Sequence, residues 1–567
     1  SGSPVRLNVA RYHVHVVLQP PVALVQIDQS FYNPFSQQQE GQFVFNLPSG
    51  ASVSRFAMYV SPTQLIEGEL VERKRAAEIY QSIVSRRRDP AILEQLGDNL
   101  FKMRVFPIFA RDEKRILLDF TLPLEPQAGQ YQFRLPLLSD QMPIWDFRVS
   151  GAIRAAVQPD SVACVSHSEL KFQARDDGGV EFDLHKNYHR PETDLVLTFA
   201  ERADRPATLR SYVAEPLPAP TGAKGSTPAN DWSQRTATYF LAEIPAAGPA
   251  KPPAAPPTDV LVLVDTSSSI TDLDAVRRTV RELVQGLRPQ DRVRLLCVDV
   301  AARPLHEGWL KPGDAVTLQG LDQEFCLGKT DLDACLRQAV EEFSDPVEKR
   351  RRLIIYVGDG ADETAPIVDR AGKRLSPEWL EASGATLVSV GMQRTEAKTD
   401  YLRWLVAASG GLWFDLAGDV RAVGSLARWL GAGLPSPERV VDAAVEGASA
   451  EDLFYASARL PGEPLYIYGR MPEAGEVKLR LTLGRGKKTV TRDWTFEVTR
   501  REDDVFVGRL WAQRRLEQLR RLDQQQEETR QAIIALSQEW SLLSPHTAFL
   551  VLETEQDYSR WLLDRRV

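Results

Sequence analysis

The stretch that decides the fold of the central part of this chain is Val260-Leu-Val-Leu-Val-Asp265-Thr-Ser267-Ser-Ser269-Ile270. Its first five residues are apolar and mostly β-branched, which is typical of a strand buried on both faces of a parallel sheet. The strand ends at Asp265, and Ser267 and Ser269 follow at alternate positions. Because open α/β sheets bind ligands at the carboxyl ends of their strands, we expect these three side chains to share one site. Such oxygens suit Mg²⁺, Mn²⁺ or Ca²⁺, whereas zinc prefers His and Cys.

Two later segments add side chains of the same kind. Taken alone, the pattern Asp-x-Ser-x-Ser is more typical of a turn that caps a helix starting near Thr271. However, Thr330 precedes a helical pattern at 331–340, and the apolar run Arg352-Leu-Ile-Ile-Tyr-Val357 predicts a second buried strand just before Asp359. Three strand or loop ends therefore supply carboxylates and hydroxyls, in the order Asp265, Ser267, Ser269, Thr330 and Asp359.

These side chains resemble the metal-ion-dependent adhesion site of the von Willebrand factor A domain, and the match is complete at all five positions. The resemblance implies that the hydroxyls contact the ion directly, whereas Asp265 and Asp359 do so directly or through water. The resemblance also implies that one coordination position stays open for a carboxylate from a partner. A cation held mainly by neutral oxygens would keep enough positive charge to attract such an anion. We therefore expect bound Mg²⁺, with Mn²⁺ or Ca²⁺ as alternatives, and a protein ligand that presents an acidic residue.

Other charged residues lie close to the predicted site in the sequence. Asp272 and Asp274 occupy positions where integrin β chains hold acids for a neighbouring ion. Acids in the first turn of a helix are also stabilised by its dipole, and we favour that interpretation. Asp362 and Glu363 follow the second strand and are candidates to rim the site or to hold waters of the ion. Lys329 is a solvated surface lysine, a charge that offsets the acidic loops, or a partner for an incoming carboxylate.

The first part of the chain has the patterns of a β-rich domain. Residues 5–125 contain short strand patterns bounded by Pro, Gly and Asn, and one helical pattern at 71–83. They resemble the vault protein inter-α-trypsin (VIT) domain, notably at Phe31-Tyr-Asn-Pro34, Gly68-Glu-Leu-Val-Glu-Arg-Lys74 and Asn99-Leu-Phe101. We interpret these residues as turns and core, without a catalytic role.

At 567 residues the chain is too long for one hydrophobic core, so we expect three or four domains. Alternating strand and helix patterns predict a doubly wound sheet, with Pro-rich linkers at 246–257 and 433–437 on either side of it. Strand patterns lie outside both linkers, so we expect the α/β domain to be inserted into a β-sandwich, as in the heavy chains of inter-α-trypsin inhibitor. The expected fold class is a multidomain α+β protein: a VIT domain (5–125), a β-sandwich-like domain in two parts (126–250 and 438–500), an inserted doubly wound von Willebrand factor A domain (256–434), and C-terminal helices with a closing strand (504–567).

Composition argues against several kinds of partner. Charged residues make up 26% and apolar residues 43%, which is ordinary for a globular protein, and the formal net charge is −8. The chain therefore has no overall positive field to attract nucleic acid or an anionic membrane. No stretch is long and apolar enough to span a bilayer. The start, Ser1-Gly-Ser-Pro4, is typical of a cloning remnant, so its lack of a signal peptide or anchor is not evidence of a cytoplasmic protein. We expect the protein to be secreted or located at the cell envelope or surface.

The sequence contains no pattern that indicates catalysis. Its seven histidines accompany no recognisable Ser or Cys nucleophile motif, and it has no Gly-rich phosphate loop. The inter-α-trypsin heavy chains link to hyaluronan through an Asp-Pro-His sequence, whereas this chain has Ser544-Pro-His546, whose hydroxyl cannot be an acyl donor. This departure, with the absence of any Asn-x-Ser/Thr sequon, favours a bacterial relative.

The four cysteines, Cys164, Cys297, Cys326 and Cys335, have no metal-ligand spacing. We expect buried free thiols, with a Cys326–Cys335 bridge as the alternative. For the whole chain we predict a non-catalytic, metal-dependent adhesion or protein-binding protein. One alternative is a scaffold in which the ion only stabilises the loops, and a less favoured one is a metal-dependent hydrolase.

Overall fold

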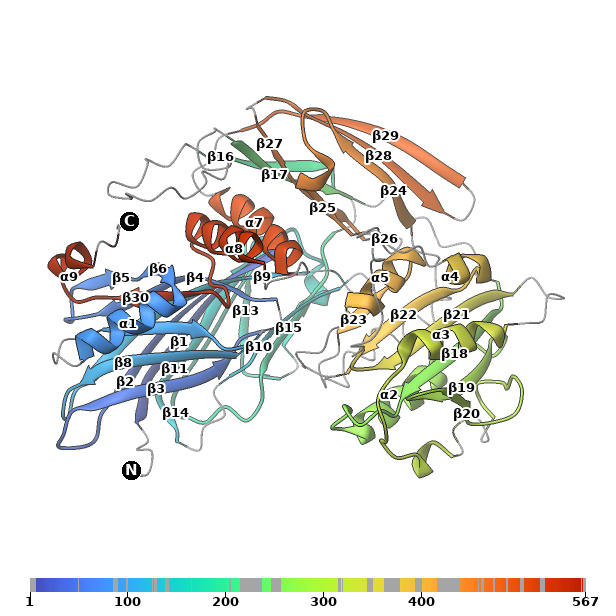
Figure 1. The fold of residues 1–567 in the computed structure, drawn as a ribbon, viewed down its shortest axis with the longest axis horizontal. Helices are drawn as coiled ribbons and strands as arrows, with labels where there is room; N and C mark the ends of the chain where they lie inside the picture. The colour runs from blue at the N-terminus through green and yellow to red at the C-terminus, as the bar shows by residue number, and fades with distance from the viewer. Residues whose placement is uncertain are drawn as a thin grey trace.

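The structure is a computed structural model that describes residues 7–48, 50–84, 90–97, 100–124, 126, 130–137, 142–164, 166–202, 205–214, 237–245, 256–314, 318, 320–343, 350–360, 378–392, 400–415, 438–456, 458–459, 463–472, 475–485, 488–499, 504–520, 526–561 and 563. These residues form a strand-rich mixed α/β protein (Figure 1). Strands from the first and last parts of the chain lie on one side, the α/β part lies on the other, and two further sheets bridge them.

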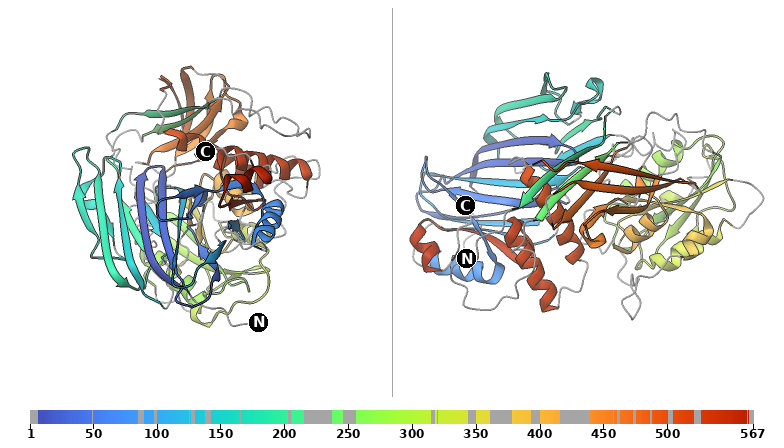
Figure 2. Two further views of the ribbon diagram at one scale, coloured as in Figure 1. Left: turned by 90° about the vertical axis from the view of Figure 1, so that its left-hand side faces the viewer. Right: turned by 90° about the horizontal axis from the view of Figure 1, so that it is seen from above.

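The largest sheet begins with the first strand of the chain. Its order is β13 (Lys171–Ala174), β14 (Val180–His189), β11 (Ile144–Ile153), β1 (Asn8–Gln19), β2 (Val22–Tyr32), β9 (Glu113–Pro123), β4 (Ser52–Tyr59) and β5 (Leu65–Glu67). Tyr12, Val14, Val16 and Leu18 alternate with less buried residues along β1, as a strand with one face in the core requires. Figure 2 shows the helices of the N- and C-terminal segments on the same side of this sheet.

This sheet continues across the boundary that we expected near residue 125. Strands β11, β13 and β14 lie within 126–250, which we assigned to the β-sandwich, yet β11 pairs in parallel with β1, with Val149 opposite Val14. The free edge of β1 explains the pairing, because an unpaired edge needs a partner and β11 has an alternating apolar face to offer. A small sheet, β10 (Tyr131–Leu135), β15 (Leu195–Phe199) and β12 (Ala163–Cys164), packs on the same core.

The second sheet of this part takes one of its interior strands from the end of the chain. Its order is β3 (Gln39–Asn46), β8 (Leu100–Ile108), β7 (Ala91–Gln95), β30 (Thr547–Val551) and β6 (Glu69–Glu72). All five residues of β30 are buried, and Phe549 lies opposite Leu93 on one side and Leu70 on the other. Helix α1 (Arg73–Val84) follows β6 and confirms the helix predicted at 71–83, although the helix starts two residues later because 71–72 belong to β6.

Two sheets connect segments from either side of the α/β part. One has the order β16 (Thr208–Ala214), β17 (Ala237–Ile244), β27 (Leu465–Met471) and β25 (Leu453–Tyr455), and the other β26 (Ala458–Arg459), β24 (Glu438–Val445), β28 (Val477–Arg485) and β29 (Lys488–Phe496). Phe240 from the first sheet and Leu481 from the second share one apolar core. Helices α7 (Val505–Arg520) and α8 (Glu527–Trp540) pack on the first sheet, where the Trp511 indole N–H donates to the Asp452 carbonyl at 2.9 Å. Helix α9 (Glu555–Arg560) follows β30.

The α/β part is an open sheet with helices on both faces. Its strand order is β20 (Ala302–Pro304), β19 (Arg292–Val298), β18 (Thr258–Asp265), β21 (Arg351–Gly358), β22 (Thr386–Gly391) and β23 (Trp413–Asp415), and only β20 is antiparallel to its neighbour. Helix α2 (Leu273–Gln285) packs on one face, whereas α3 (Leu332–Glu341), α4 (Glu378–Ser383) and α5 (Asp400–Ala408) pack on the other. Every residue of β18 is buried, as its apolar run predicts for a central strand.

The thiols and helices settle two smaller expectations. All four cysteines are free, so the alternative of a Cys326–Cys335 bridge is wrong for this structure; the Cys335 thiol donates instead to the Asp299 carbonyl at 3.4 Å. Cys297 and Cys335 are buried as predicted, whereas Cys164 and Cys326 are only half-buried. Across the described ranges, no helix is both long and apolar enough to cross a membrane.

Candidate metal centre

Asp265 is the fixed point of the candidate site. It ends β18, is fully buried, and accepts hydrogen bonds from the Tyr356 hydroxyl at 2.5 Å and from the Ser267 backbone N–H at 2.9 Å. Strand β21 passes so close that a Cβ on Gly358 would lie 2.4 Å from the Asp265 Cβ. The carboxylate is therefore held at the carboxyl end of β18, where the chain order reverses between β19 and β21 and such sheets bind ligands.

The surroundings of Asp265 disfavour an uncompensated negative charge. Burial raises the pKa of Asp265 to about 6; the hydrogen bond from Tyr356 acts in the opposite direction, and the negative charge of Asp359 raises the pKa further. The two carboxylates are thus close enough to influence each other. A bound cation would offset both the loss of solvation and this repulsion.

The serines of the motif lie over the end of the strand. The Ser267 and Ser269 hydroxyl oxygens are 2.9 Å apart, and Ser267 is buried whereas Ser269 is exposed. The turn that brings them together is closed by the Ile270 N–H, which donates to the Ser267 carbonyl at 3.2 Å. One hydroxyl therefore faces the interior of the site and the other its solvent side.

The loop that carries Thr330 is tied to the serine loop by backbone hydrogen bonds. The Leu327 N–H donates to the Thr266 carbonyl at 2.8 Å, and the Ser268 N–H donates to the Gly328 carbonyl at 2.9 Å. Gly328 has a positive φ of 76°, a conformation that favours glycine at this turn. On the other side of Thr330, the Asp331 N–H donates to the Asp299 carbonyl at 2.9 Å and the Asp331 side chain caps α3. The half-buried Thr330 thus lies between two anchored points beside the serine loop.

Asp359 reaches the same edge of the sheet from β21. The parallel pairing sets Val357 opposite Val264, so Asp359 lies just beyond the strand end, next to Asp265, and only 3% of it is exposed. The Tyr356 hydroxyl that donates to Asp265 also accepts the Gly360 N–H at 3.1 Å. Tyr356 therefore couples the position of Asp265 to the turn that contains Asp359.

The donor set suits a hard divalent cation. Among the residues that the structure describes, no three His, Cys, Asp or Glu side chains gather into a metal-binding group, so a cation at this edge would depend on the hydroxyls. Carboxylate and hydroxyl oxygens are ligands for Mg²⁺, Mn²⁺ or Ca²⁺. The assignment of all five predicted ligands stays a prediction.

The neighbouring acids divide between structural roles and undescribed positions. Asp272 is the N-cap of α2 and accepts the Ala275 N–H at 2.9 Å, and Asp274 pairs with Arg277 at 2.7 Å, which confirms the helix-start interpretation for both. Asp362 and Glu363 lie outside the described residues. Lys329 is exposed, which is compatible with a solvated lysine, with a charge that offsets the acidic loops and with a partner for an incoming carboxylate.

Two residues that position Asp265 were not predicted from the sequence. Tyr356 and Gly358 were treated as parts of a strand and its turn, yet the first donates to Asp265 and the second makes room for it. A signal was present: Tyr356 is the one polar-tipped residue within the apolar run 353–357, and a buried tyrosine hydroxyl needs a partner.

Exposed apolar side chains border the site. Val300 is 64% exposed, Phe325 72% and Leu327 70%, and we call these three residues the apolar rim. Leu327 belongs to the loop bonded to the serine turn, and a Cβ on Gly328 would lie 3.8 Å from Val300. Exposed apolar patches are typical of surfaces that bind other proteins, and these three side chains belong to the two loops on this side of the site.

Comparison with known families identifies the first part of the chain. Residues 9–120 match the family model of the vault protein inter-alpha-trypsin domain. The chain contains a VIT domain. The matched residues include β2 to β8 and most of β1 and β9, whereas the VIT domain's second sheet also holds β30 from the far end of the chain. Among curated proteins, none matches the chain.

Solved structures similar to the chain include von Willebrand factor A proteins. A von Willebrand factor type A structure from Catenulispora acidiphila is 14% identical, covering 50% of this chain and 74% of its own, with a TM-score of 0.31. The ArnB paralog VWA2 from Sulfolobus acidocaldarius is also 14% identical, covering 63% and 92%, with a TM-score of 0.31. Proximal thread matrix protein 1 from the mussel byssus, solved with a zinc-occupied MIDAS motif, is 16% identical, covering 31% and 46%, with a TM-score of 0.23. TM-scores this low do not establish an equivalent arrangement.

Proposed function

We propose that the α/β part binds a divalent cation, Mg²⁺ in the first place, through Asp265, Ser267, Ser269, Thr330 and Asp359. The observation that carries the proposal is that three separate segments meet at the carboxyl end of β18. There the two serine hydroxyls are in contact, the Thr330 loop is bonded to the serine turn, and the buried Asp265 is near a second carboxylate. A cation would compensate that pair of acids.

We further propose that the bound ion captures an acidic side chain of a partner protein. Three of the five ligands are neutral hydroxyls, so the ion would keep net positive charge toward an incoming carboxylate. The apolar rim supports a protein partner, since Val300, Phe325 and Leu327 would be covered when a surface docks on the ion. In this function the site catalyses no chemical reaction. Capture of a partner protein in this way would suit a secreted or surface protein.

We infer a domain division close to that predicted from the sequence. The α/β part at 256–434 is one inserted unit, because β17 precedes it and pairs with β27, which follows it. The VIT part includes residues 5–125. It also includes β11, β13 and β14, which lie within 126–250 but belong to its first sheet. Residues 438–500 complete the bridging sheets. Residues 504–567 supply α7 and α8, which pack on one of those sheets, and β30, which joins the VIT part.

Calorimetric titration with Mg²⁺ and Mn²⁺ tests the metal proposal. The wild-type chain should give saturable binding at one site, and Ser267→Ala and Thr330→Val should each weaken it at least tenfold, since each removes one oxygen ligand. Ser268→Ala is the matched control, because Ser268 lies in the same turn but contributes only its backbone N–H to the loop contact. No heat for the wild-type chain, or equal weakening in the control, would refute the site.

Water-proton relaxation of bound Mn²⁺ tests the open position. If one position faces solvent, bound Mn²⁺ should enhance water relaxation, and added acetate should lower that enhancement by replacing the water. An ion that binds but shows no acetate effect would instead favour the scaffold function, in which the cation only holds the Thr330 loop against the serine turn.

A further inference from the structure

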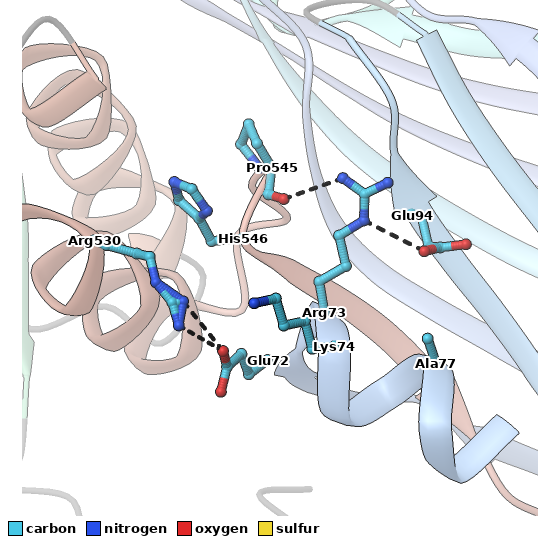
Figure 3. A pocket seen from close by; sticks show the side chains of 8 residues that line it. All are labelled: Glu72, Arg73, Lys74, Ala77, Glu94, Arg530, Pro545 and His546. Carbon is cyan, nitrogen blue, oxygen red and sulfur yellow. Dashed lines mark hydrogen bonds and ion pairs between the residues drawn. The ribbon is translucent and has the colours of Figure 1, made fainter. Parts of the chain in front are cut away.

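A polar pocket lies where the C-terminal segment meets the VIT domain, on the opposite side of the molecule from β18 (Figures 1 and 3). It has a volume of about 390 Å³. Its walls come from the end of β6, the start of α1, strand β7, the start of α8 and the turn before β30. The charged and polar side chains in those walls are Glu72, Arg73, Lys74, Glu94, Arg530 and His546.

Both acids in the pocket are engaged along its walls. The Glu72 carboxylate accepts hydrogen bonds from both terminal nitrogens of Arg530, with N···O distances of 3.2 and 2.7 Å. Glu94 accepts from Arg73 at 3.4 Å and from Arg104 at 3.1 Å. The remaining cation, Lys74, is exposed, and in Figure 3 its amino group points into the space between Arg73, Arg530 and His546. The lining therefore has three permanent cations and two carboxylates, with the amino group at its centre.

His546 adds a ring nitrogen that has no hydrogen-bond partner among the described residues. Its Nε2 is buried, and no described residue forms a hydrogen bond with it. Burial lowers the pKa of His546 first, and the charges of Arg530, Arg520 and Arg73 lower it further, against the opposite effect of Glu527. Arginines on three elements thus create a positive potential at the imidazole.

The start of α1 contributes in the same direction. Arg73, Lys74 and Arg75 occupy its first turn, which has no acidic residue, although the positive end of a helix dipole favours anions and disfavours cations. Three successive cations at this end repel the dipole and each other. An anion in the pocket would relieve that repulsion.

We propose that this pocket binds a small tetrahedral oxyanion such as inorganic phosphate. Lys74 and the Nε2–H of a neutral His546 would donate to its oxygens, while Arg73 and Arg530 supply positive charge at the walls. Because Lys74 belongs to α1 of the VIT domain and His546 and Arg530 belong to the C-terminal segment, the anion would fasten the end of the chain to its beginning. This proposal is independent of the metal centre.

Thermal unfolding and titration calorimetry with sodium phosphate, on the full chain, test this inference. EDTA is present throughout so that the metal centre cannot report, and sodium chloride at equal ionic strength is the reference. Wild-type protein should show saturable, phosphate-specific binding and a higher unfolding midpoint. Lys74→Gln should weaken binding at least tenfold, whereas Lys171→Gln, which removes an exposed lysine on the distant edge strand β13, should leave it unchanged.

A second readout keeps the result clear if stability changes. Histidine ring resonances of the wild-type chain should include one that shifts with phosphate and not with chloride, and His546→Gln should remove that resonance. Equal phosphate binding by the wild-type and Lys74→Gln chains would overturn the proposal. So would a response that chloride reproduces.

Discussion

At the scale of single residues, the space around Asp265 is set by what β21 does not carry. Gly358 has no side chain, and a Cβ there would lie 2.4 Å from the Asp265 Cβ and 2.6 Å from the Tyr356 hydroxyl. Neither of those neighbours can yield easily, because both are buried and bonded to each other. Position 358 therefore controls both local packing and the orientation of the candidate ligand.

Gly358→Ala should destabilise the α/β part and weaken cation binding. Overpacking of a buried site costs about 1–3 kcal/mol, and any adjustment displaces Asp265 or Tyr356. Urea unfolding and Mn²⁺ titration measure the two effects. Gly313→Ala, where a Cβ would meet no atom within 4 Å, is the matched control and should change neither. A Gly358→Ala chain with unchanged stability and affinity would show that the close approach is not real.

Glu243 on β17 predicts a pH dependence of stability. Burial raises the pKa of Glu243 from 4.5 to about 7, although Arg205, 2.7 Å away, opposes the shift. The folded state therefore holds more protons between these values, so the contribution of Glu243 to stability is fully present below pH 4.5 and is lost as pH rises through 7, by up to about 3 kcal/mol. Urea unfolding from pH 5 to 8 should show a shallower decline for Glu243→Gln than for wild type. Parallel curves would contradict this assignment.

At the scale of elements, the placement of β30 is the main structural result for the VIT domain. It lies between β7 and β6, so the second sheet of the domain is incomplete without the end of the chain. The Tyr558 hydroxyl, just after this strand, donates to the Glu67 carbonyl at 3.0 Å and accepts the Leu552 N–H at 3.0 Å. These contacts hold the C-terminal segment across the sheet edge near β5 and β6.

Phe549→Ala should destabilise the VIT domain strongly. Phe549 is 2% exposed, and truncating a buried phenylalanine costs about 3–5 kcal/mol. Phe172→Ala on β13 is the control; its side chain is 39% exposed, so the loss should stay below about 1 kcal/mol. Chemical unfolding followed by near-ultraviolet dichroism measures both, and similar losses would mean that β30 is not a core strand.

Sequence patterns predicted the helices and strands better than they predicted which strands pair with each other. The buried run at 260–264 and the helical patterns became β18, α2, α3 and α5, because period and residue type act locally. The pairing of β30 with β7 and β6 joins residues far apart in the chain, and nothing in its five apolar residues specifies the neighbours. The same reason explains β11, whose alternation predicts a strand but not its place beside β1. For the metal site, residue types indicated the ligands, whereas the supporting Tyr356 and Gly358 needed the structure.

At the scale of the whole molecule, the chain leaves its β-rich part after β17 and re-enters it at β24, so the α/β part is attached at both ends. Pairing of β17 with β27, and of β24 with β28, makes these two attachments parts of sheets. Helix α7 packs on the first of them through Trp511 and Tyr239, whose ring centroids are 5.2 Å apart. The candidate metal centre is thus carried by a unit joined to a framework of paired strands.

Cation binding should therefore protect the α/β part without changing the VIT domain. A ligand at 100 times its Kd adds about 2.7 kcal/mol to the stability of the unit that binds it. Hydrogen exchange with and without Mn²⁺ should show slower exchange in peptides covering 260–272, 326–331 and 357–360, and no change in peptides covering 91–108. Protection spread equally over both parts would indicate that the ion acts on the whole framework.

The most direct test of the central claim is the position of a bound cation in crystals grown or soaked with Mn²⁺. We expect one anomalous-scattering peak at the carboxyl end of β18, with the Ser267, Ser269 and Thr330 hydroxyl oxygens as direct ligands and Asp265 and Asp359 beside it. No peak at that edge of the sheet under saturating Mn²⁺, or a peak whose ligands exclude the three hydroxyls, would contradict it.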